Sequence, residues 1–98
     1  MNQYLIDIDL PRSPSEEFIE LIPSQRAHVN ALMAEGKVAS YSLSMDRSRL
    51  WVIVNAETSD AARGIIASFP IIASIKFRIH ELAFHNFVRF LRPQFSLN

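Results

Sequence analysis

Hydrophobic side chains alternate with polar ones over residues 3–10, near the start of the chain. The apolar members fall at every second position: Tyr4, Ile6, Ile8 and Leu10. A period of two is typical of a β-strand with one buried face. Ser15 and the two acidic residues after it then predict a helix start, because a serine oxygen accepts from free backbone N–H groups and acids favour the positive end of the helix dipole.

The apolar spacing changes to a helical period after Ser15. Its members recur along one stripe: Phe18, Ile22, Val29, Leu32 and Met33. Pro23 lies inside this pattern, and we expect a kink or a short break there because proline lacks a backbone donor and clashes with the preceding turn. The pair Glu35-Gly36 predicts the helix end, since glycine tolerates the left-handed conformation that commonly closes a helix.

Two more alternating segments, residues 38–45 and 50–55, are separated by a polar turn at 46–48. This arrangement predicts an antiparallel hairpin. We expect the helices to cover one face of the resulting sheet, with Val38 on the opposite face. The hairpin side chains expected toward the helices are Tyr41, Leu43, Met45, Leu50, Val52 and Val54.

A second helix is predicted from Thr58 or Ser59 to Pro70, and a last strand over residues 75–80. The order β-α-β-β-α-β predicts a ferredoxin-like α+β domain with an antiparallel sheet, over residues 1–85. The remaining segment, 86–98, is rich in aromatic side chains. A disordered tail is normally poor in aromatics, so we expect this one to pack on its own domain or on a neighbouring subunit.

Composition narrows the classes of function. The chain has 98 residues and zero formal net charge, without the basic excess that is common in nucleic-acid-binding proteins. There is no cysteine, which excludes disulfides and thiolate chemistry. We see neither an apolar run of the ~20 residues that span a membrane nor a secretory signal, so we expect a cytoplasmic location. No metal-ligand spacing or glycine-rich phosphate loop stands out, and we expect no cofactor.

The sheet face opposite the helices is predicted to carry mixed chemistry. Its substrate-binding candidates are Asp7, Ser42, Trp51, Asn55 and Arg78. A few convergent polar groups in an apolar concave site are typical of ligand pockets, and His80, with Asp7 across the sheet, is a candidate general base near neutral pH. A second interpretation stays open, in which this face buries Trp51 and Ile53 against another subunit. The two are compatible, because a dimer can enclose a pocket.

Several motifs resemble those of the muconolactone isomerase family. They are Glu35-Gly36, Leu50-Trp51, Thr58-Ser59-Asp60, Phe69-Pro70-Ile71 and the segment from Leu82 to His85. The resemblance implies a dimeric α+β barrel that often assembles further. It also implies an enzyme that moves a double bond in a lactone by proton transfer without a cofactor, with Glu35 as the motif-matched acid. The chain departs from the family at Ser42-Leu43, where the family has Trp-Arg, and at His85-Asn86, where it has His-Pro.

The leading hypothesis from the sequence is a homo-oligomeric, muconolactone isomerase-like protein that binds a small organic acid or lactone. In this hypothesis it isomerises the ligand by proton transfer, and Glu35 and His80 are the acid and base candidates. The alternative is a non-catalytic homo-oligomeric assembly or ligand-sensing module. Neither hypothesis includes nucleic acid or a membrane as a partner.

Overall fold

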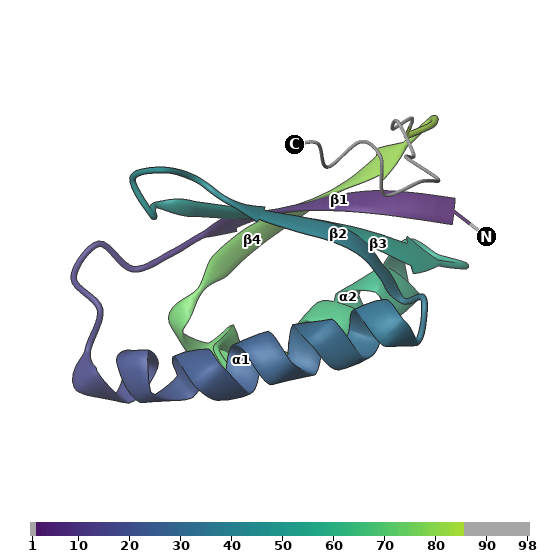
Figure 1. The fold of residues 1–98 in the computed structure, drawn as a ribbon. Helices are drawn as coiled ribbons and strands as arrows, with labels where there is room; N and C mark the ends of the chain where they lie inside the picture. The colour runs from purple at the N-terminus through teal and green to yellow at the C-terminus, as the bar shows by residue number, and fades with distance from the viewer. Residues whose placement is uncertain (1, 86–98) are drawn as a thin grey trace, which may run out of the picture.

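The computed structural model describes residues 2–85 of the chain. Its elements follow the predicted order (Figure 1): β1 (Asn2–Asp9), α1 (Glu16–Ala34), β2 (Val38–Leu43), β3 (Arg49–Ala56), α2 (Ser59–Ala67), the short 3-10 helix η1 (Ile72–Ser74) and β4 (Lys76–Leu82). The segment 86–98, predicted to pack on a domain, lies outside the described residues. In the part of the chain that is described, no helix is both long and apolar enough to cross a membrane.

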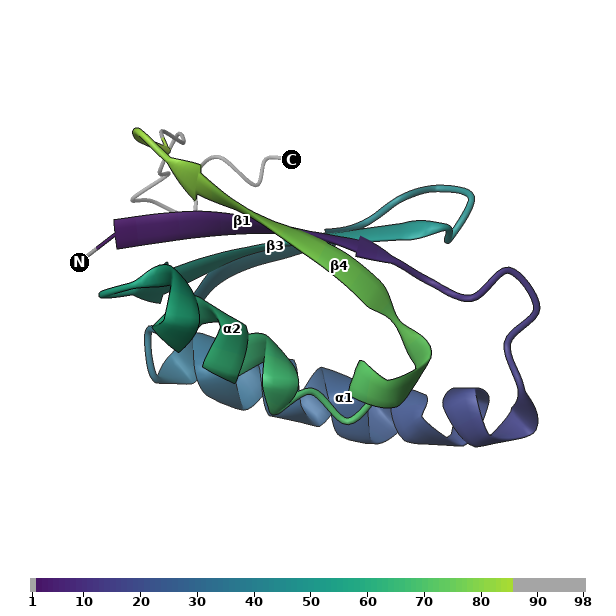
Figure 2. The same cartoon turned by 180° about the vertical axis from the view of Figure 1, so that it is seen from behind.

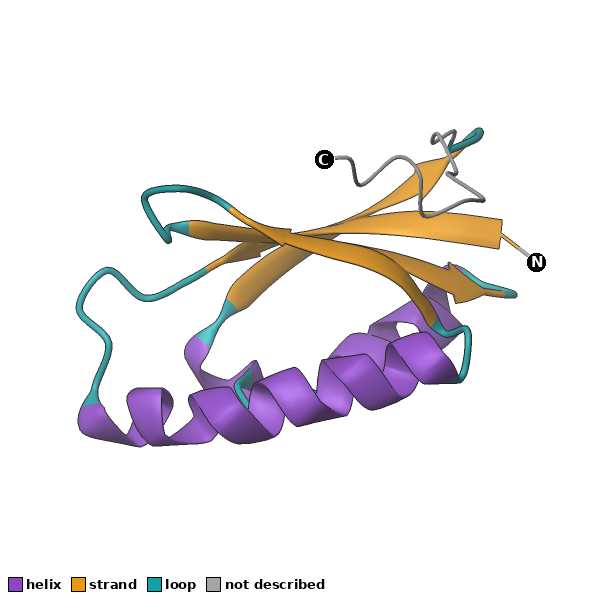
Figure 3. Ribbon diagram, in the orientation of Figure 1, coloured by secondary structure: helices purple, strands orange, loops and turns teal. Residues whose placement is uncertain are grey.

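The four strands form one antiparallel sheet in the order β2-β3-β1-β4. Both α-helices lie on the same side of this sheet, as the front and back views show (Figures 1 and 2). This two-layer arrangement is the ferredoxin-like α+β fold, and it confirms the predicted fold class. The other side of the sheet is covered by none of the described helices (Figure 3), and we call it the outer face.

Three predicted helix boundaries are confirmed by their capping contacts. Ser15 Oγ accepts a hydrogen bond from Phe18 N at 3.1 Å, and Thr58 Oγ1 accepts one from Ala61 N at 3.1 Å. Each such cap satisfies a backbone donor that the helix leaves free and is worth about 1 kcal/mol. Gly36 follows the end of α1 with φ +78°, a left-handed conformation that favours glycine.

α1 runs without interruption through Pro23, so the break expected there is wrong. Proline at this position removes the hydrogen bond to the carbonyl of Ile19, four residues earlier. Both side chains lie on the exposed side of the helix, where that carbonyl can bond to water instead. The apolar stripe on the opposite side holds α1 against the sheet across this point.

β2 departs from the prediction because a β-bulge interrupts its alternation. The pairing with β3 shifts register between Val38 and Ser40, and an extra residue at a bulge changes the side to which its neighbours point. Val38 therefore lies opposite Val54 and is buried, so its predicted place on the outer face is wrong. Met45 lies beyond the strand and is 98% exposed, so its expected position against the helices is also wrong.

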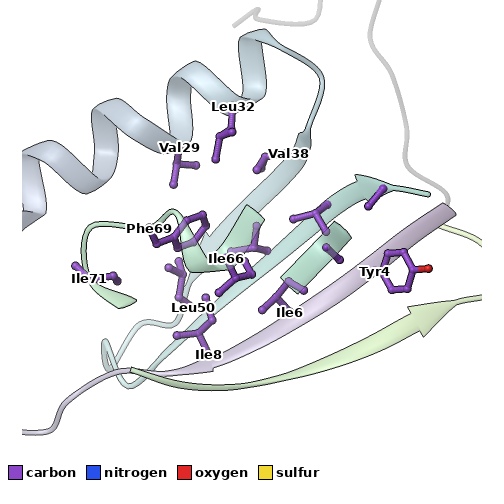
Figure 4. Packing of buried hydrophobic residues seen from close by; sticks show 14 of the residues in the cluster. Tyr4, Ile6, Ile8, Val29, Leu32, Val38, Leu50, Ile66, Phe69 and Ile71 are labelled. Atoms are coloured by element: carbon purple, nitrogen blue, oxygen red, sulfur yellow. The ribbon is translucent and has the colours of Figure 1, made fainter. Parts of the chain in front are cut away.

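The hydrophobic core fills the space between the sheet and the helices (Figure 4). Its largest fully buried side chains are Phe69, Ile6, Ile8, Ile66, Val52 and Val54. These confirm the predicted inward sides of β1 and β3 and the apolar stripe of α2. Phe77 and Ile79 of the edge strand β4 are partly buried against the same core.

Candidate ligand-binding site

Four of the predicted substrate-binding residues lie in one row across the outer face. The strand pairing places Ser42 opposite Trp51, Trp51 opposite Asp7, and Asp7 opposite Arg78. Asp7 Oδ1 accepts from Arg49 Nη1 at 3.1 Å, and Asp7 Oδ2 lies 4.0 Å from Arg78 Nη2. The structure thus brings the four residues together, with the Asp7 carboxylate already paired to cations.

Asn55, the fifth candidate, lies apart from that row. Its Nδ2 donates to the carbonyl of Gly36 at 2.9 Å, and its Oδ1 accepts from Gln3 Nε2 at 3.0 Å. The amide nitrogen therefore connects β3 to the residue that follows α1, and the amide oxygen connects β3 to β1. These contacts give Asn55 a role in holding the α1–β2 connection.

The two predicted acid–base residues lie at opposite edges of the sheet. Glu35 ends α1 beside the edge strand β2, and its Oε1 lies 3.3 Å from Lys37 Nζ. His80 lies on the other edge strand, β4, where it pairs with Leu5. Adjacent strands are about 4.8 Å apart, so two intervening strands separate β2 from β4 by roughly 14 Å. A single subunit does not bring Glu35 and His80 to the same small molecule.

A cavity of about 630 Å³ opens on the helix side of the sheet. It lies where the β1–α1 loop, residues 18–30 of α1 and the β2–β3 hairpin meet. The loop, the start of α1 and the hairpin are at the left of Figure 1. The apolar part of its wall consists of Leu10, Pro11, Pro14, Phe18, Ile22, Val29, Leu43, Leu50 and Ile71. The polar part consists of Gln25, Arg26, Asn30, Tyr41 and Arg47. We call this space the α1–hairpin cavity; its volume falls within the range of small-molecule sites, about 300–1,000 Å³.

Two strand residues that were predicted to face the helices contribute to this cavity. Tyr41 and Leu43 lie opposite Val52 and Leu50 in the sheet, as expected, yet they are 38% and 45% exposed. Both line the cavity, so their apolar surface faces an open space and not a packed helix.

Gln25 is the unusual member of the cavity wall. Its side chain is 7% exposed, and its Oε1 accepts from Ile71 N at 3.3 Å. Its Nε2 is buried and has no hydrogen-bond partner among the described residues, an arrangement that costs about 1–3 kcal/mol for a buried donor. Sequence reasoning missed Gln25, although it lies four positions before Val29 on the apolar stripe of α1 and is the polar exception there.

Arg47 is unusual in its backbone. It has φ +62° in the hairpin turn, a left-handed conformation that costs a residue other than glycine roughly 1–2 kcal/mol. Non-glycine residues held in such conformations concentrate at functional sites. Arg47 lines the α1–hairpin cavity. A residue with an unfavourable backbone conformation therefore lies in the wall of the candidate site.

The cavity offers hydrogen-bond donors but no acid–base pair. Among its described lining residues there is no carboxylate and no imidazole. Tyr41 donates to Asn30 Oδ1 at 3.4 Å, and Gln25, Arg26 and Arg47 are further donor-bearing residues of the wall. Within residues 2–85, no three His, Asp or Glu side chains are grouped closely enough to hold a metal ion. This arrangement suits binding of an acceptor-bearing molecule.

Asp46, next to Arg47, holds the hairpin turn in place. Hydrogen bonds from the side chain and backbone of Ser48, and from the side chain of Ser44, lower the pKa of Asp46 to about 2. The carboxylate is thus engaged by the turn itself. Its contacts fix the turn in which the Arg47 backbone adopts its left-handed conformation.

We predict that Asp46 titrates near pH 2 in an NMR titration of the side-chain carboxyl carbon. The folded pKa is below the unfolded value of about 3.9, so the stabilising contribution is present above that value and is lost as the pH falls through about 2. The variant Ser48→Ala removes the largest contribution, and its Asp46 pKa should rise. A wild-type midpoint close to 3.9 would contradict these turn contacts.

His28 joins the two helices outside the cavity. Ser68 Oγ donates its hydrogen to the carbonyl of Ile65 at 2.6 Å, so the 2.7 Å contact with His28 Nε2 requires the imidazole to donate. The ring also meets Phe69 edge-on, with ring centroids 6.1 Å apart. These contacts make His28 a packing residue between α1 and α2.

Comparison of the chain with protein-family models and with curated proteins finds no match. The muconolactone isomerase resemblance therefore stays a prediction from the sequence motifs. The evidence for the α+β fold and for the α1–hairpin cavity comes from the structure and not from related proteins.

Proposed function

We propose that this protein binds a small, largely apolar molecule in the α1–hairpin cavity. One observation carries the proposal: Gln25 lines a 630 Å³ cavity with a mostly apolar wall, and its buried Nε2 has no hydrogen-bond partner among the described residues. Apolar walls with a few placed polar groups are the usual composition of ligand sites. An acceptor atom inside the cavity would give this donor the partner it lacks.

The geometry favours binding over catalysis for this cavity. Proton transfer needs an acid or base within hydrogen-bond reach of the reacting atoms, and the described cavity wall has neither a carboxylate nor an imidazole. The isomerase hypothesis names Glu35 and His80 as acid/base candidates, and neither lines this cavity. They also lie at opposite edges of one sheet, so a site that used both would require residues from two subunits. A ligand-sensing or ligand-carrying module needs no such arrangement.

A compound panel tests the proposal directly. The panel contains small apolar acids, lactones and neutral alcohols, and binding is followed by changes in the backbone amide NMR signals of the full chain. We expect binders to shift signals from α1 residues 18–30 and from the hairpin at 41–50. Shifts confined to the outer face, around Trp51 and His80, would move the site there, and no binder at all would count against the proposal.

Assembly through the outer face is a second candidate function, supported by a different observation. Leu5, Trp51 and Ile53 lie side by side on β1 and β3 in the middle of this face. Ile53 is already buried, whereas Leu5 is half-buried and Trp51 is 38% exposed. Arg49 bonds Asp7 and Asp9 at the same face. An apolar centre with a charged surround resembles the anatomy of protein interfaces, so we propose a second copy of the chain as its partner.

Trp51→Ala is expected to weaken this self-association much more than His80→Ala. Buried tryptophans at interface centres typically contribute 2 kcal/mol or more, which corresponds to a change of about thirtyfold or more in the dimer dissociation constant. His80 lies on the edge strand β4 and is exposed, so its removal should change the constant less than about tenfold. Sedimentation equilibrium of both variants provides the comparison, and equal effects would contradict an interface centred on Trp51.

A further inference from the structure

The mouth of the α1–hairpin cavity carries positive charge without a matching negative partner. Arg26 and Arg47 are the charged groups in its described wall. Within residues 2–85, neither is in an ion pair. The nearest carboxylate along the chain, Asp46, is held by the hydroxyls of Ser44 and Ser48. An anionic group on a ligand would therefore find a guanidinium free to pair with it.

Of the two arginines, Arg47 is the one whose position requires an explanation. Arg26 lies within α1, where arginine is an ordinary residue. Arg47 lies in a turn conformation that glycine or asparagine adopts more easily. Its backbone N–H donates to Ser44 O at 2.9 Å, and Ser44 N donates to Arg49 O at 2.9 Å, so the hairpin itself fixes this conformation. The turn requires only a residue that tolerates a positive φ at position 47. It does not require a guanidinium group there.

We propose that the ligand is an apolar monocarboxylic acid and that Arg47 binds its carboxylate. This inference rests on the proposed function and adds the ligand class and the residue that selects it. The planar guanidinium can donate two parallel hydrogen bonds to a carboxylate. The hydrocarbon body then lies against the apolar wall formed by Val29 and Leu50, and an oxygen atom farther along that body would be the acceptor for Gln25 Nε2. The sequence left an acid or a lactone open, and the charge of the cavity mouth favours the acid.

Binding of octanoate and of 1-octanol, measured by isothermal titration calorimetry, tests this assignment. The two probes have the same chain length and differ in charge. Arg47→Gly removes the guanidinium and places the residue best suited to φ +62° in the turn, so the variant should melt at or above the temperature of the wild type. Arg47→Lys keeps a charge without the planar fork. Arg63→Gln is the matched control, because it also removes one positive charge but lies on α2 against Phe77.

We expect the wild type and Arg63→Gln to bind octanoate at least tenfold more tightly than 1-octanol, since a hydrogen bond to a charged group is worth about that factor or more. Arg47→Gly should lose this preference while its affinity for 1-octanol stays unchanged, and Arg47→Lys should keep part of it. If the wild type binds both probes equally, or if Arg47→Gly keeps the preference, the acid assignment is overturned while the cavity remains a binding site. If neither probe binds the wild type, this inference fails, and the compound panel decides the proposed function separately.

Discussion

Phe69→Ala should lower the free energy of unfolding by about 3–5 kcal/mol, the usual range for removing a buried phenylalanine. Phe69 is 1% exposed and packs in the core beside Ile66 (Figure 4). Its ring also meets that of His28 of α1 edge-on. The truncated side chain would leave a cavity where α1, α2 and the sheet meet. Because small domains are stable by only about 5–15 kcal/mol, urea unfolding followed by circular dichroism should show a large fall in the midpoint.

Phe84→Ala provides the matched control for this prediction. Phe84 is 77% exposed, and substitutions at such positions usually change stability by less than about 0.5 kcal/mol. Similar losses in the two variants would mean that the core does not centre on the α1–α2 contact.

Ile22→Trp should abolish binding in the α1–hairpin cavity, with a loss of affinity of tenfold or more for the best-bound member of the compound panel. Ile22 lines the cavity and is partly buried against the core. An indole at this position would occupy space that the ligand needs, and a cavity open to solvent can admit it without the strain of overpacking a filled core. Calorimetric titration measures the affinity, and circular dichroism verifies the fold.

Ser24→Trp introduces the same side chain two positions later on α1. Ser24 is exposed and is not part of the cavity wall, and at about 100° per residue it lies on the opposite side of the helix from Ile22. Ligand affinity in this control should match the wild type. If Ile22→Trp binds as tightly as Ser24→Trp, the ligand does not occupy the cavity.

The elements of the fold could be predicted from local signals. Alternation in β1 and β3 specified their buried sides, and Ser15 and Thr58 specified the starts of α1 and α2, because these patterns depend on chemistry within a few residues. The bulge after Val38 could not be predicted in this way. Alternation assumes a regular ladder, whereas a bulge depends on how the neighbouring strand pairs.

Pro23 shows a second limit of local reasoning. Proline is unfavourable inside a helix on average, but here the lost hydrogen bond falls on the exposed side of α1 while the opposite side packs against the core. Tertiary packing outweighs the local preference at this position. The apolar stripe in the sequence indicated the buried side of the helix, but the local rule for proline does not take that packing into account.

The candidate site was predicted least well, for a geometric reason. The row from Ser42 to Arg78 followed from strand alternation, and the structure does bring these residues together. Glu35 was chosen from a motif and His80 from its residue type and its place on the predicted sheet, without the strand order that separates them. The cavity itself arises where α1 and the hairpin diverge, and no local pattern encodes that space. Two residues carried a signal that could have revealed it: Gln25, polar on an apolar stripe, and Arg47, charged at a turn position that suits glycine.

The side-chain amide of Gln25 provides the most direct test of ligand binding in the α1–hairpin cavity. Its Nε2 protons can be assigned by NMR, and nuclear Overhauser effects between them and a bound panel compound report whether the two are close in space. Binding in this cavity should produce such effects, together with a shift of the Nε2 proton signals as the unpaired donor gains an acceptor. A compound that binds tightly but leaves the Gln25 amide signals unchanged, without any Overhauser effect to them, would contradict it.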